Sequence, residues 1–203
     1  MTRHYPVCRD TKNCRNDLVK IHKRARTVGQ ITPPQKVKPI FGLLYKTQGE
    51  FQSIKERIES HFSPIDYTSE EFAFTETHYY EKEMGADLIR RYVSTQELIY
   101  PDRLPHYKNL TNLWEDKTRQ EGNRAINIDP GYLTPAKLVL ASTKDFSQRI
   151  YLGKGIYAEI TMTYARGDFI QLPWTYPDYY NHRDVFQEIR AILIEQIRNQ
   201  PRD

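Results

Sequence analysis

Residues Arg149–Tyr164 read R-I-Y-L-G-K-G-I-Y-A-E-I-T-M-T-Y, and apolar and polar side chains alternate on both sides of the Gly-Lys-Gly turn. Alternation of this kind is typical of half-buried strands, and a short glycine turn between two such runs predicts a β-hairpin. The two strands are expected at Arg149–Leu152 and Ile156–Tyr164, and Ala165–Asp168 makes the next turn. This stretch therefore places an antiparallel sheet in the second half of the chain.

The first half of the chain predicts strands and helices in turn. The apolar run at Lys38–Tyr45 indicates a buried strand. Thr47 and Glu50 form a capping-box pattern, and apolar residues at helical spacing extend the helix to about His61. Further elements are expected as the strands Ile65–Phe74 and Ile89–Thr95 and the helix Asp102–Gln120.

The residues between that helix and the hairpin predict a strand, a turn and a short helix. Arg124–Ile128 is expected as a strand that ends at the turn signal Asp129–Gly131. Thr134 followed by Pro135 is typical of a helix start and predicts a short helix through Lys137–Ala141.

The order of these elements is β-α-β-β-α-β, followed by a helical turn, a β-meander and a closing helix capped by Asn181. This order predicts an α+β fold with a ferredoxin-like core, in which helices lie on one face of an antiparallel sheet. The closing helix carries one apolar face, made by Val185, Ile189, Ile192 and Ile197. We expect one α+β domain at residues 38–200, behind a basic, flexible arm at residues 1–37.

Charge is divided unevenly between the arm and the domain. From Met1 to Lys38 there are ten Lys and Arg residues against Asp10 and Asp17, a balance of +8. The rest of the chain carries 20 basic and 24 acidic residues, or −4. A basic segment poor in apolar residues does not order itself by burial, and it attracts polyanions. The arm is therefore either a solubilising tail or an electrostatic contact to nucleic acid, such as RNA, or to another polyanion.

Composition and motifs exclude several classes of protein. No apolar run approaches the roughly 18–20 residues of a membrane helix, and no secretory signal is evident. The two cysteines, Cys8 and Cys14, do not make a disulfide scaffold or a zinc-binding spacing, which favours a cytoplasmic protein. No phosphate-binding P-loop, zinc-hydrolase histidine pair or serine-hydrolase elbow occurs.

Polar residues of the predicted strands fall on one face of the sheet, because alternate residues of a strand share a face. If the strands are neighbours, that face carries Asn127, Asp129, Arg149, Tyr151, Tyr157, Glu159 and Thr161. Two carboxylates and a guanidinium among tyrosines favour shifted pKa values, and we predict Asp129, Glu159 and Arg149 as catalytic residues. A solvated sheet face with ordinary cross-strand ion pairs has the same pattern.

Further residues are predicted to bind a ligand. Lys137 and Lys144 would hold an anion, with backbone donors from the helix start at Thr134. Leu172–Tyr180 is a proline-stiffened aromatic segment that serves either as a core lid or as a stacking platform. Its predicted ligand contacts and the other candidates are Trp174, Tyr176, Tyr132, Tyr157, Tyr80 and Glu83. No metal ligands are predicted, and the cofactor is left open, with Mg²⁺ as one option.

Four long motifs carry a resemblance to a known family. They are F-x-F-T-x-x-x-Y-Y-E-K-E-M-G at Phe72–Gly85, N-I-D-P-G-Y-L-T-P-A-K-L-V-L-A-S-T-K at Asn127–Lys144, R-I-Y-L-G-K-G-I-Y-A-E-I-T at Arg149–Thr161 and L-P-W-T-Y-P-D-Y at Leu172–Tyr179. Over about residues 38–195 the chain resembles an uncharacterised bacterial family, the domain of unknown function four-four-one-six. The resemblance implies a bacterial cytoplasmic protein with no assigned reaction. Members of that family often have histidine where this chain has Gln148, which argues against a histidine base there.

Three functions remain open from the sequence. The first is binding of a small anionic, nucleotide-like ligand, or an enzyme that acts on such a ligand. The second is an RNA-associated module that uses the arm for phosphates and the aromatic segment for bases. The third is a protein-interaction module that uses the tyrosine-rich surface.

Overall fold

The structure is a computed structural model that describes residues 29–119 and 121–200. In this part of the chain nine strands form one open sheet, and all their pairings are antiparallel. The strands are β1 Lys38–Tyr45, β2 Ile65–Thr68, β3 Phe72–Ala73, β4 Ile89–Thr95, β5 Asn127–Thr134, β6 Lys137–Ser142, β7 Arg149–Gly153, β8 Ile156–Ala165 and β9 Asp168–Gln171. Their order is β2-β4-β1-β5-β6-β8-β7, and β3 pairs with β4 and β9 with β8.

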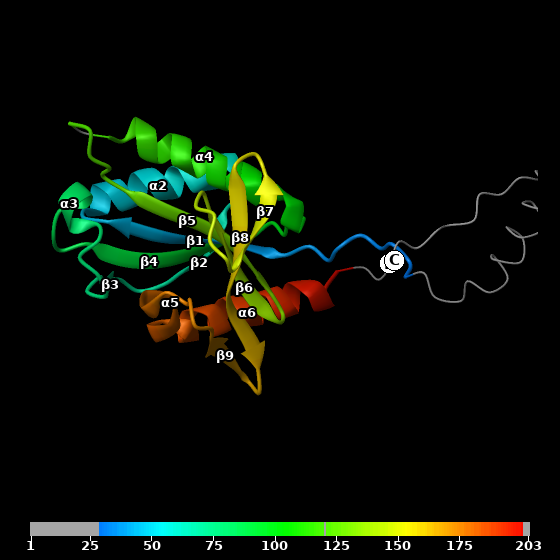
Figure 1. The fold of residues 1–203 in the computed structure, drawn as a ribbon. Coiled ribbons are helices and arrows are strands. Elements are labelled where there is room, and N and C mark those ends of the chain that lie inside the picture. The colour runs from blue at the N-terminus through cyan, green and yellow to red at the C-terminus, as the bar shows by residue number, and fades with distance from the viewer. Residues whose placement is uncertain (1–28, 120, 201–203) are drawn as a thin grey trace, which may run out of the picture. The chain divides into compact units, whose positions relative to one another are not determined.

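Helices cover both faces of the sheet, which confirms a mixed α and β fold but not the expected restriction of helices to one face (Figure 1). Helices α2 and α4 lie over one face, and α5 and α6 over the other. The helical elements are α2 Gln48–His61, α3 Glu81–Met84, the 3-10 turn η1 Pro101–Arg103, α4 Leu104–Lys117, α5 Pro177–Asn181 and α6 Arg183–Arg198.

Local sequence signals account for the first strand and helix. All eight residues of β1 are buried, as its apolar run predicts, because both faces of this central strand are covered. Helix α2 begins after Thr47, whose side chain accepts a hydrogen bond from the Glu50 amide. The Glu50 carboxylate in turn accepts from the Thr47 amide at 2.9 Å, so the predicted capping box is confirmed.

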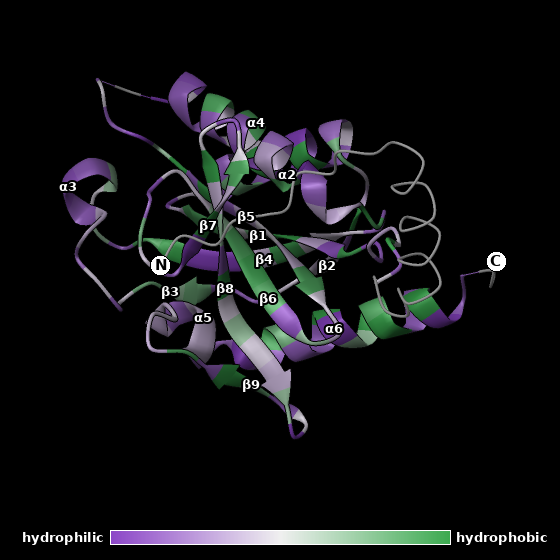
Figure 2. Ribbon diagram, turned by 45° about the vertical axis from the view of Figure 1, so that its right-hand side comes forward, coloured by the Kyte–Doolittle hydropathy of each residue, from purple (hydrophilic) through white to green (hydrophobic). Residues whose placement is uncertain are grey.

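Each helical layer has its own apolar core. The core beneath α2 and α4 contains Phe41, Leu43, Phe51, Ile54, Ile58, Val93, Tyr107, Trp114 and Ile128. The core beneath α6 contains Ile40, Tyr92, Leu133, Leu138, Met162, Phe186, Ile189 and Leu193. Figure 2 shows the hydrophobic residues concentrated on the strands and on α6, whereas α3 is largely hydrophilic.

The most consequential feature of the sheet is a split between β5 and β6. The two strands pair only from Gly131 to Thr134, opposite Leu140 to Lys137. Before Gly131, from Asn127 to Pro130, β5 lies beside β1 alone, while the matching part of β6 lies beside β8 (Figure 1). The first half of β5 therefore has a free edge in the middle of the sheet.

The predicted turn at Asp129–Gly131 is wrong, because β5 runs straight through these residues. Proline lacks an amide hydrogen and normally interrupts a central strand. Here Pro130 lies one residue before pairing with β6 begins, so no β6 carbonyl requires its amide. The strand also begins at Asn127 rather than Arg124.

The predicted short helix at Lys137–Ala141 is also wrong, since these residues belong to strand β6. The Thr134 side chain does accept hydrogen bonds from the amides of Ala136 and Lys137, at 3.1 and 3.0 Å. This local pattern is shared by helix starts and tight turns. Residues 137–142 pair with β5 and β8, and this long-range pairing favours the turn over the helix.

The hairpin of β7 and β8 forms where the sequence predicts it, but its alternation is interrupted. A register shift opposite Leu138 and Val139 inserts Thr161 as an extra residue, which moves Met162 onto the α6 face. On β7 the expected burial is inverted: Arg149 is 9% exposed and Ile150 is 68% exposed. Arg149 is buried because Glu159, Ser142 and Tyr176, which accept its hydrogen bonds, enclose the guanidinium.

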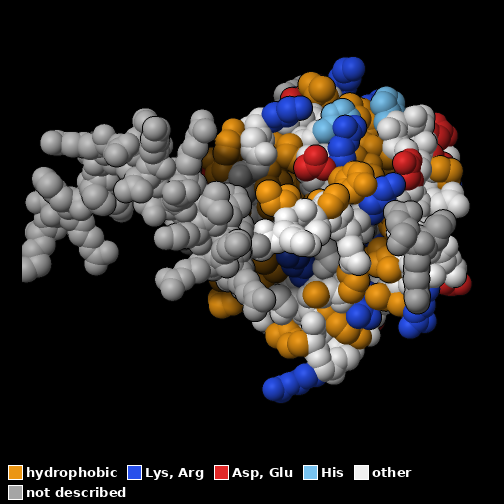
Figure 3. Space-filling model, turned by 90° about the vertical axis from the view of Figure 1, so that its right-hand side faces the viewer, with side chains coloured by type: hydrophobic (Ala, Val, Ile, Leu, Met, Phe, Trp, Pro, Cys, Tyr) orange, Lys and Arg blue, Asp and Glu red, His pale blue; other side chains and the backbone are white. Residues whose placement is uncertain are grey.

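Smaller differences concern element boundaries. The predicted strand Ile65–Phe74 is broken into β2 and β3, and the closing helix begins after His182, because α5 occupies Pro177–Asn181. Hydrophobic side chains reach the surface among Lys and Arg on the side of the molecule seen in Figure 3. The predicted arm, with both cysteines, falls mainly on residues 1–28, outside the described residues. Among the helices that the structure describes, none is long and apolar enough to cross a membrane.

Candidate functional site

A cavity of about 790 Å³ occupies the split in the sheet. Its walls are Asn127 and Asp129 on β5 and Leu140–Ser142 on β6. Helix α4 closes one side with Lys108 and Glu115, and the α5 segment closes the other with residues 176–179. The cavity is within the range of small-molecule sites, and residues from five strands and two helices meet in it.

Arg149 and Glu159 form a buried ion pair on the β7–β8 side of the cavity. Both side chains are 2% exposed, and Arg149 Nε donates to Glu159 Oε2 at 2.8 Å. The guanidinium also donates to Ser142 Oγ at 2.8 Å, to the Lys144 carbonyl at 3.0 Å and to Tyr176 Oη at 2.9 Å. Four hydrogen bonds hold Arg149 rigidly and leave its NH2 with one uncommitted donor.

Exposed aromatic side chains surround the outer part of the cavity. Tyr79 is 65% exposed, Phe146 is 52% exposed and Tyr176 is 44% exposed. The Arg149 guanidinium lies 4.7 Å from the Phe146 ring centre, and Lys144 Nζ lies 5.2 Å from that of Tyr79. We call Tyr79, Lys144, Phe146, Arg149 and Tyr176 the rim group. It combines aromatic faces with positive charge, which suits a planar anion.

The aromatic segment before α5 is anchored to β8 at the bulge. Trp174 Nε1 donates to the Ile160 carbonyl at 2.8 Å, and the buried Thr175 hydroxyl donates to the Thr161 carbonyl. Thr175 Oγ also accepts from the Leu172 amide at 2.8 Å. Trp174 is therefore committed to the sheet edge, whereas Tyr176 follows directly and lines the cavity.

Asp129 lies in the inner part of the cavity, between two cations. Its Oδ2 accepts from Asn127 Nδ2 at 2.8 Å and lies 3.5 Å from an Arg90 nitrogen. Its Oδ1 lies 3.8 Å from Lys108 Nζ. The Asp129 side chain is 24% exposed, against 3% for Arg90 and 9% for Lys108.

The free edge of β5 is satisfied by two side chains of α4. Glu115 Oε1 accepts the Ile128 amide at 2.9 Å, and Lys108 Nζ donates to the Ile128 carbonyl at 2.9 Å. These contacts take the place of the missing β6 partner, so the split leaves no unpaired backbone group at Ile128. Burial raises the pKa of Glu115, which the adjacent Lys108 partly offsets.

Arg124 connects this edge to α3. It makes two hydrogen bonds to Glu83, at 2.9 and 2.7 Å, and one to Glu115 Oε2 at 2.8 Å. It also donates to Asn127 Oδ1 at 3.0 Å, which orients the amide so that its nitrogen points to Asp129. Hydrogen bonding to Arg124 lowers the pKa of Glu83.

The inner wall contains buried polar atoms with no hydrogen-bond partner. Among the described residues five such side-chain atoms occur, and four belong to the cavity lining: Arg90 Nε, Glu159 Oε1, Asp178 Oδ2 and Tyr179 Oη. Asp178 Oδ2 lies 2.8 Å from Arg90 NH2 as an ion pair, without hydrogen-bond geometry. Burial raises the pKa of Asp178 and of Tyr179, because the charged form of each is desolvated.

The structure brings together about half of the residues predicted for a site. Six line the cavity: Asp129, Arg149, Glu159, Lys144, Tyr176 and Tyr80. Burial raises the pKa of Tyr80 beside Asp129. Glu83 does not line the cavity but holds Arg124, which does.

The other predicted residues lie elsewhere. Tyr132, Thr134 and Lys137 belong to the paired end of β5 and β6, where no helix start exists to supply backbone donors. Tyr157, two residues before Glu159 on β8, packs against Tyr151 near the hairpin turn. Trp174 bonds the Ile160 carbonyl and does not line the cavity, whereas Tyr176 of the same segment does.

Sequence reasoning missed Arg90, Lys108, Asp178 and Tyr179. One signal was present for α4: Lys108, Thr111 and Glu115 repeat at helical spacing beside the apolar stripe of Tyr107 and Trp114, and all three are buried. A second polar stripe next to an apolar one indicates a buried polar contact. Arg90 has no such signal, because its role depends on pairing with residues about 90 positions away.

The charges of the lining are balanced, and no metal site is evident. Six basic and six acidic side chains line the cavity. Within the described ranges no group of three or more His, Cys, Asp or Glu residues is placed to hold a metal ion.

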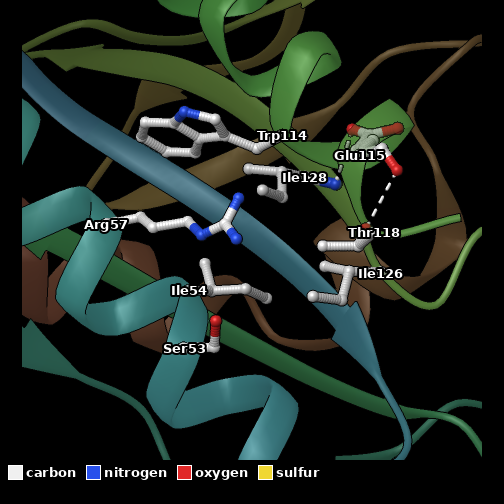
Figure 4. A pocket seen from close by; sticks show the side chains of 8 residues that line it. All are labelled: Ser53, Ile54, Arg57, Trp114, Glu115, Thr118, Ile126 and Ile128. Atoms are coloured by element: carbon white, nitrogen blue, oxygen red, sulfur yellow. Dashed lines mark hydrogen bonds between the residues drawn. The ribbon is translucent and has the colours of Figure 1, made fainter.

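A second hollow, between α2 and α4, is too narrow for a water molecule (Figure 4). Arg57 of α2 extends toward Trp114 and Ile128 across it. Glu115 lines this hollow as well as the cavity and bonds the Ile128 amide there. The hollow is therefore packing between helices, and the cavity in the split sheet is the candidate site.

Comparison with known proteins identifies a protein family whose model matches this chain. Residues 35–193 match the family described as Domain of unknown function (DUF4416), and the match covers most of the chain. The chain belongs to this family, which confirms the resemblance carried by the four motifs. No curated protein and no solved structure matches it.

Proposed function

We propose that the cavity binds a small anionic ligand with a planar group, such as a nucleotide. The observation that carries this proposal is the cavity of about 790 Å³ with the rim group at its outer part, where two cations lie beside exposed aromatic rings. Cavities of this size that combine aromatic surface with a few placed polar groups are typical small-molecule sites.

Lys144 supports an anion in the outer part of the cavity. Of the six basic side chains in the lining, it alone has no carboxylate within 4 Å among residues 29–119 and 121–200. Arg149 beside it has one uncommitted donor, and the exposed rings of Tyr79 and Phe146 flank both cations. A phosphate would meet the two cations while a planar group stacks on the aromatic rings.

An enzyme at this site would use acid–base chemistry of carboxylates. Asp129 is the most accessible ionisable group of the inner part, and the raised pKa of Asp178 makes it a candidate proton donor. Arg149 and Glu159 are better suited to orient the ligand, because the pair is buried and bonded on most of its atoms.

A thermal-shift panel of nucleotides, sugar phosphates, inorganic phosphate and Mg²⁺ tests the proposal. A ligand at about 100 times its Kd stabilises the folded protein by about 2.7 kcal/mol. We expect nucleotides to raise the melting temperature by several degrees. Lys144→Ala should reduce that shift and Lys55→Ala, which changes a lysine of α2 away from the cavity, should not.

Lys144→Ala is preferred to Arg149→Ala as the diagnostic variant, because Lys144 is exposed and makes no ion pair in the described structure. If no compound of the panel shifts the melting temperature of the unmodified protein, the proposal is wrong. If the ligand raises the melting temperature of the Lys144 and Lys55 variants equally, the anionic group does not bind at the rim group.

The RNA-associated and protein-interaction alternatives rest on the arm and on the tyrosine-rich surface. Deleting residues 1–33, which keeps the buried Val37 and its pairing with Ile99, should abolish RNA binding under the first alternative and leave nucleotide binding unchanged under our proposal. Measuring both affinities on the same shortened chain separates the two. We also propose a cytoplasmic location, on the cysteine usage alone.

A finer fold assignment is also proposed for the first half of the domain. We infer a ferredoxin-like core made of β1, α2, β2, β4, α4 and β5. The sheet order β2-β4-β1-β5 and the position of α2 and α4 over one face support it. An experimental structure with a different order of these four strands would contradict it.

A further inference from the structure

The inner part of the cavity presents a carboxylate to a ligand, although cations surround it. Arg90 and Lys108 are 3% and 9% exposed, whereas Asp129 between them is 24% exposed. A ligand that fills the cavity therefore touches the Asp129 oxygens before it reaches either cation.

The Asp129 carboxylate is held in place with acceptor capacity to spare. Asn127 donates to Oδ2 at 2.8 Å, and Arg124 fixes the orientation of that amide from behind. Oδ1 lies 3.8 Å from Lys108 Nζ, beyond hydrogen-bond distance, and accepts no hydrogen bond from the described residues. A carboxylate accepts about four hydrogen bonds, so Asp129 has room for a donor from a ligand.

The balance of charge argues against a second anion at this end. Lys144, Arg149 and Glu159 carry a net positive charge on the outer side. The remaining lining has four basic and five acidic side chains. An anionic group is therefore favoured near Lys144, and a neutral hydrogen-bond donor is favoured near Asp129.

We propose that Asp129 selects the ligand by accepting a hydrogen bond from a neutral hydroxyl or amino group. The ligand class is then an anion that carries such a donor beyond its anionic group, as the sugar hydroxyls of a nucleotide do. This inference rests on the proposed function and adds a specificity-determining residue to it. Asn127 and Arg124 are positioning residues, because they act through Asp129.

Calorimetric titration with two matched probes tests the inference. Adenosine 5′-monophosphate and its 2′,3′-dideoxy analogue share the base and the phosphate and differ in the two sugar hydroxyls. A hydrogen bond to a charged acceptor contributes about tenfold or more in affinity, so we expect the first probe to bind about tenfold more tightly. In Asp129→Asn this preference should shrink toward equality, whereas Asp102→Asn, which changes an exposed carboxylate of η1, should keep it.

The outcomes separate this inference from the proposed function. If neither probe binds the unmodified protein, both the proposed nucleotide binding and the inference about Asp129 are wrong. If both bind with equal affinity, the cavity binds nucleotides but Asp129 does not select them, and only the inference is overturned. The same follows if Asp129→Asn weakens both probes equally. The comparison on the unmodified protein needs no variant, so it remains decisive even if Asp129→Asn does not fold.

Discussion

The hydroxyl of Tyr179 occupies the space in which a side chain at Gly42 would begin: a Cβ there would lie 2.1 Å from Tyr179 Oη. Gly42 is the register partner of Asp129 in the sheet, so the bare backbone at this point makes room for the wall of the cavity. A glycine in the middle of a buried strand costs stability, and here the close approach of Tyr179 requires it.

Gly42→Ala should therefore destabilise the protein by about 1–3 kcal/mol, because the new Cβ overlaps Tyr179 Oη and the buried ring has to shift. Urea unfolding measures the change. Gly49→Ala is the matched control, since its nearest neighbour would be 3.9 Å away and alanine suits a helix. A neutral Gly42→Ala would show that Tyr179 is not held over the strand.

Arg149→Met should cost about 3–5 kcal/mol, because it leaves the Glu159 carboxylate buried and unpaired. The double variant Arg149→Met with Glu159→Leu should recover much of that loss, since no uncompensated charge remains. Denaturant unfolding of both variants and of Glu159→Leu completes a double-mutant cycle. Additive losses would indicate that the two side chains do not interact.

Glu115→Ala should destabilise more than Glu115→Gln. Alanine removes the acceptor of the Ile128 amide and leaves the free edge of β5 unsatisfied, at about 1–3 kcal/mol for a buried group. Glutamine retains one oxygen that can accept the amide, so its loss should be smaller. Hydrogen exchange at Ile128 reports the contact directly, and equal protection in all three proteins would contradict it.

The free energy of unfolding should fall as the pH is lowered below 6.5, because His182 then has to take up a proton. Burial against Phe72 and Tyr92 lowers the pKa of His182 from its usual 6.5, although Glu76 and Asp178 oppose the shift. Between the folded pKa and 6.5 the unfolded chain binds more protons, so stability rises with pH there and is lost as pH falls. NMR titration of the ring measures the pKa. His182→Gln should flatten the pH dependence of unfolding in this window; an unchanged slope would assign it to other groups.

The elements that could be predicted from sequence are those specified by neighbours along the chain. The Thr47 capping box, the apolar run of β1 and the β7–β8 hairpin depend on contacts within a few residues, and all three form as predicted. Alternation within strands also placed Asp129, Arg149 and Glu159 on one face correctly, because side-chain direction follows from strand geometry.

Tertiary structure decided which residues of that face meet in the cavity. The Thr134–Pro135 pattern suits a helix start or a tight turn, and only pairing of β6 with β5 and β8 resolved it as a turn. The split between β6 and residues 127–130 of β5 depends on which strands fail to pair, and no single segment encodes that. Arg90, Lys108 and Asp178 enter the cavity from three elements far apart in sequence. By itself the sequence determined β1, the capped start of α2 and the β7–β8 hairpin. Long-range pairing decided which residues line the cavity, because burial there depends on partners that local patterns do not encode.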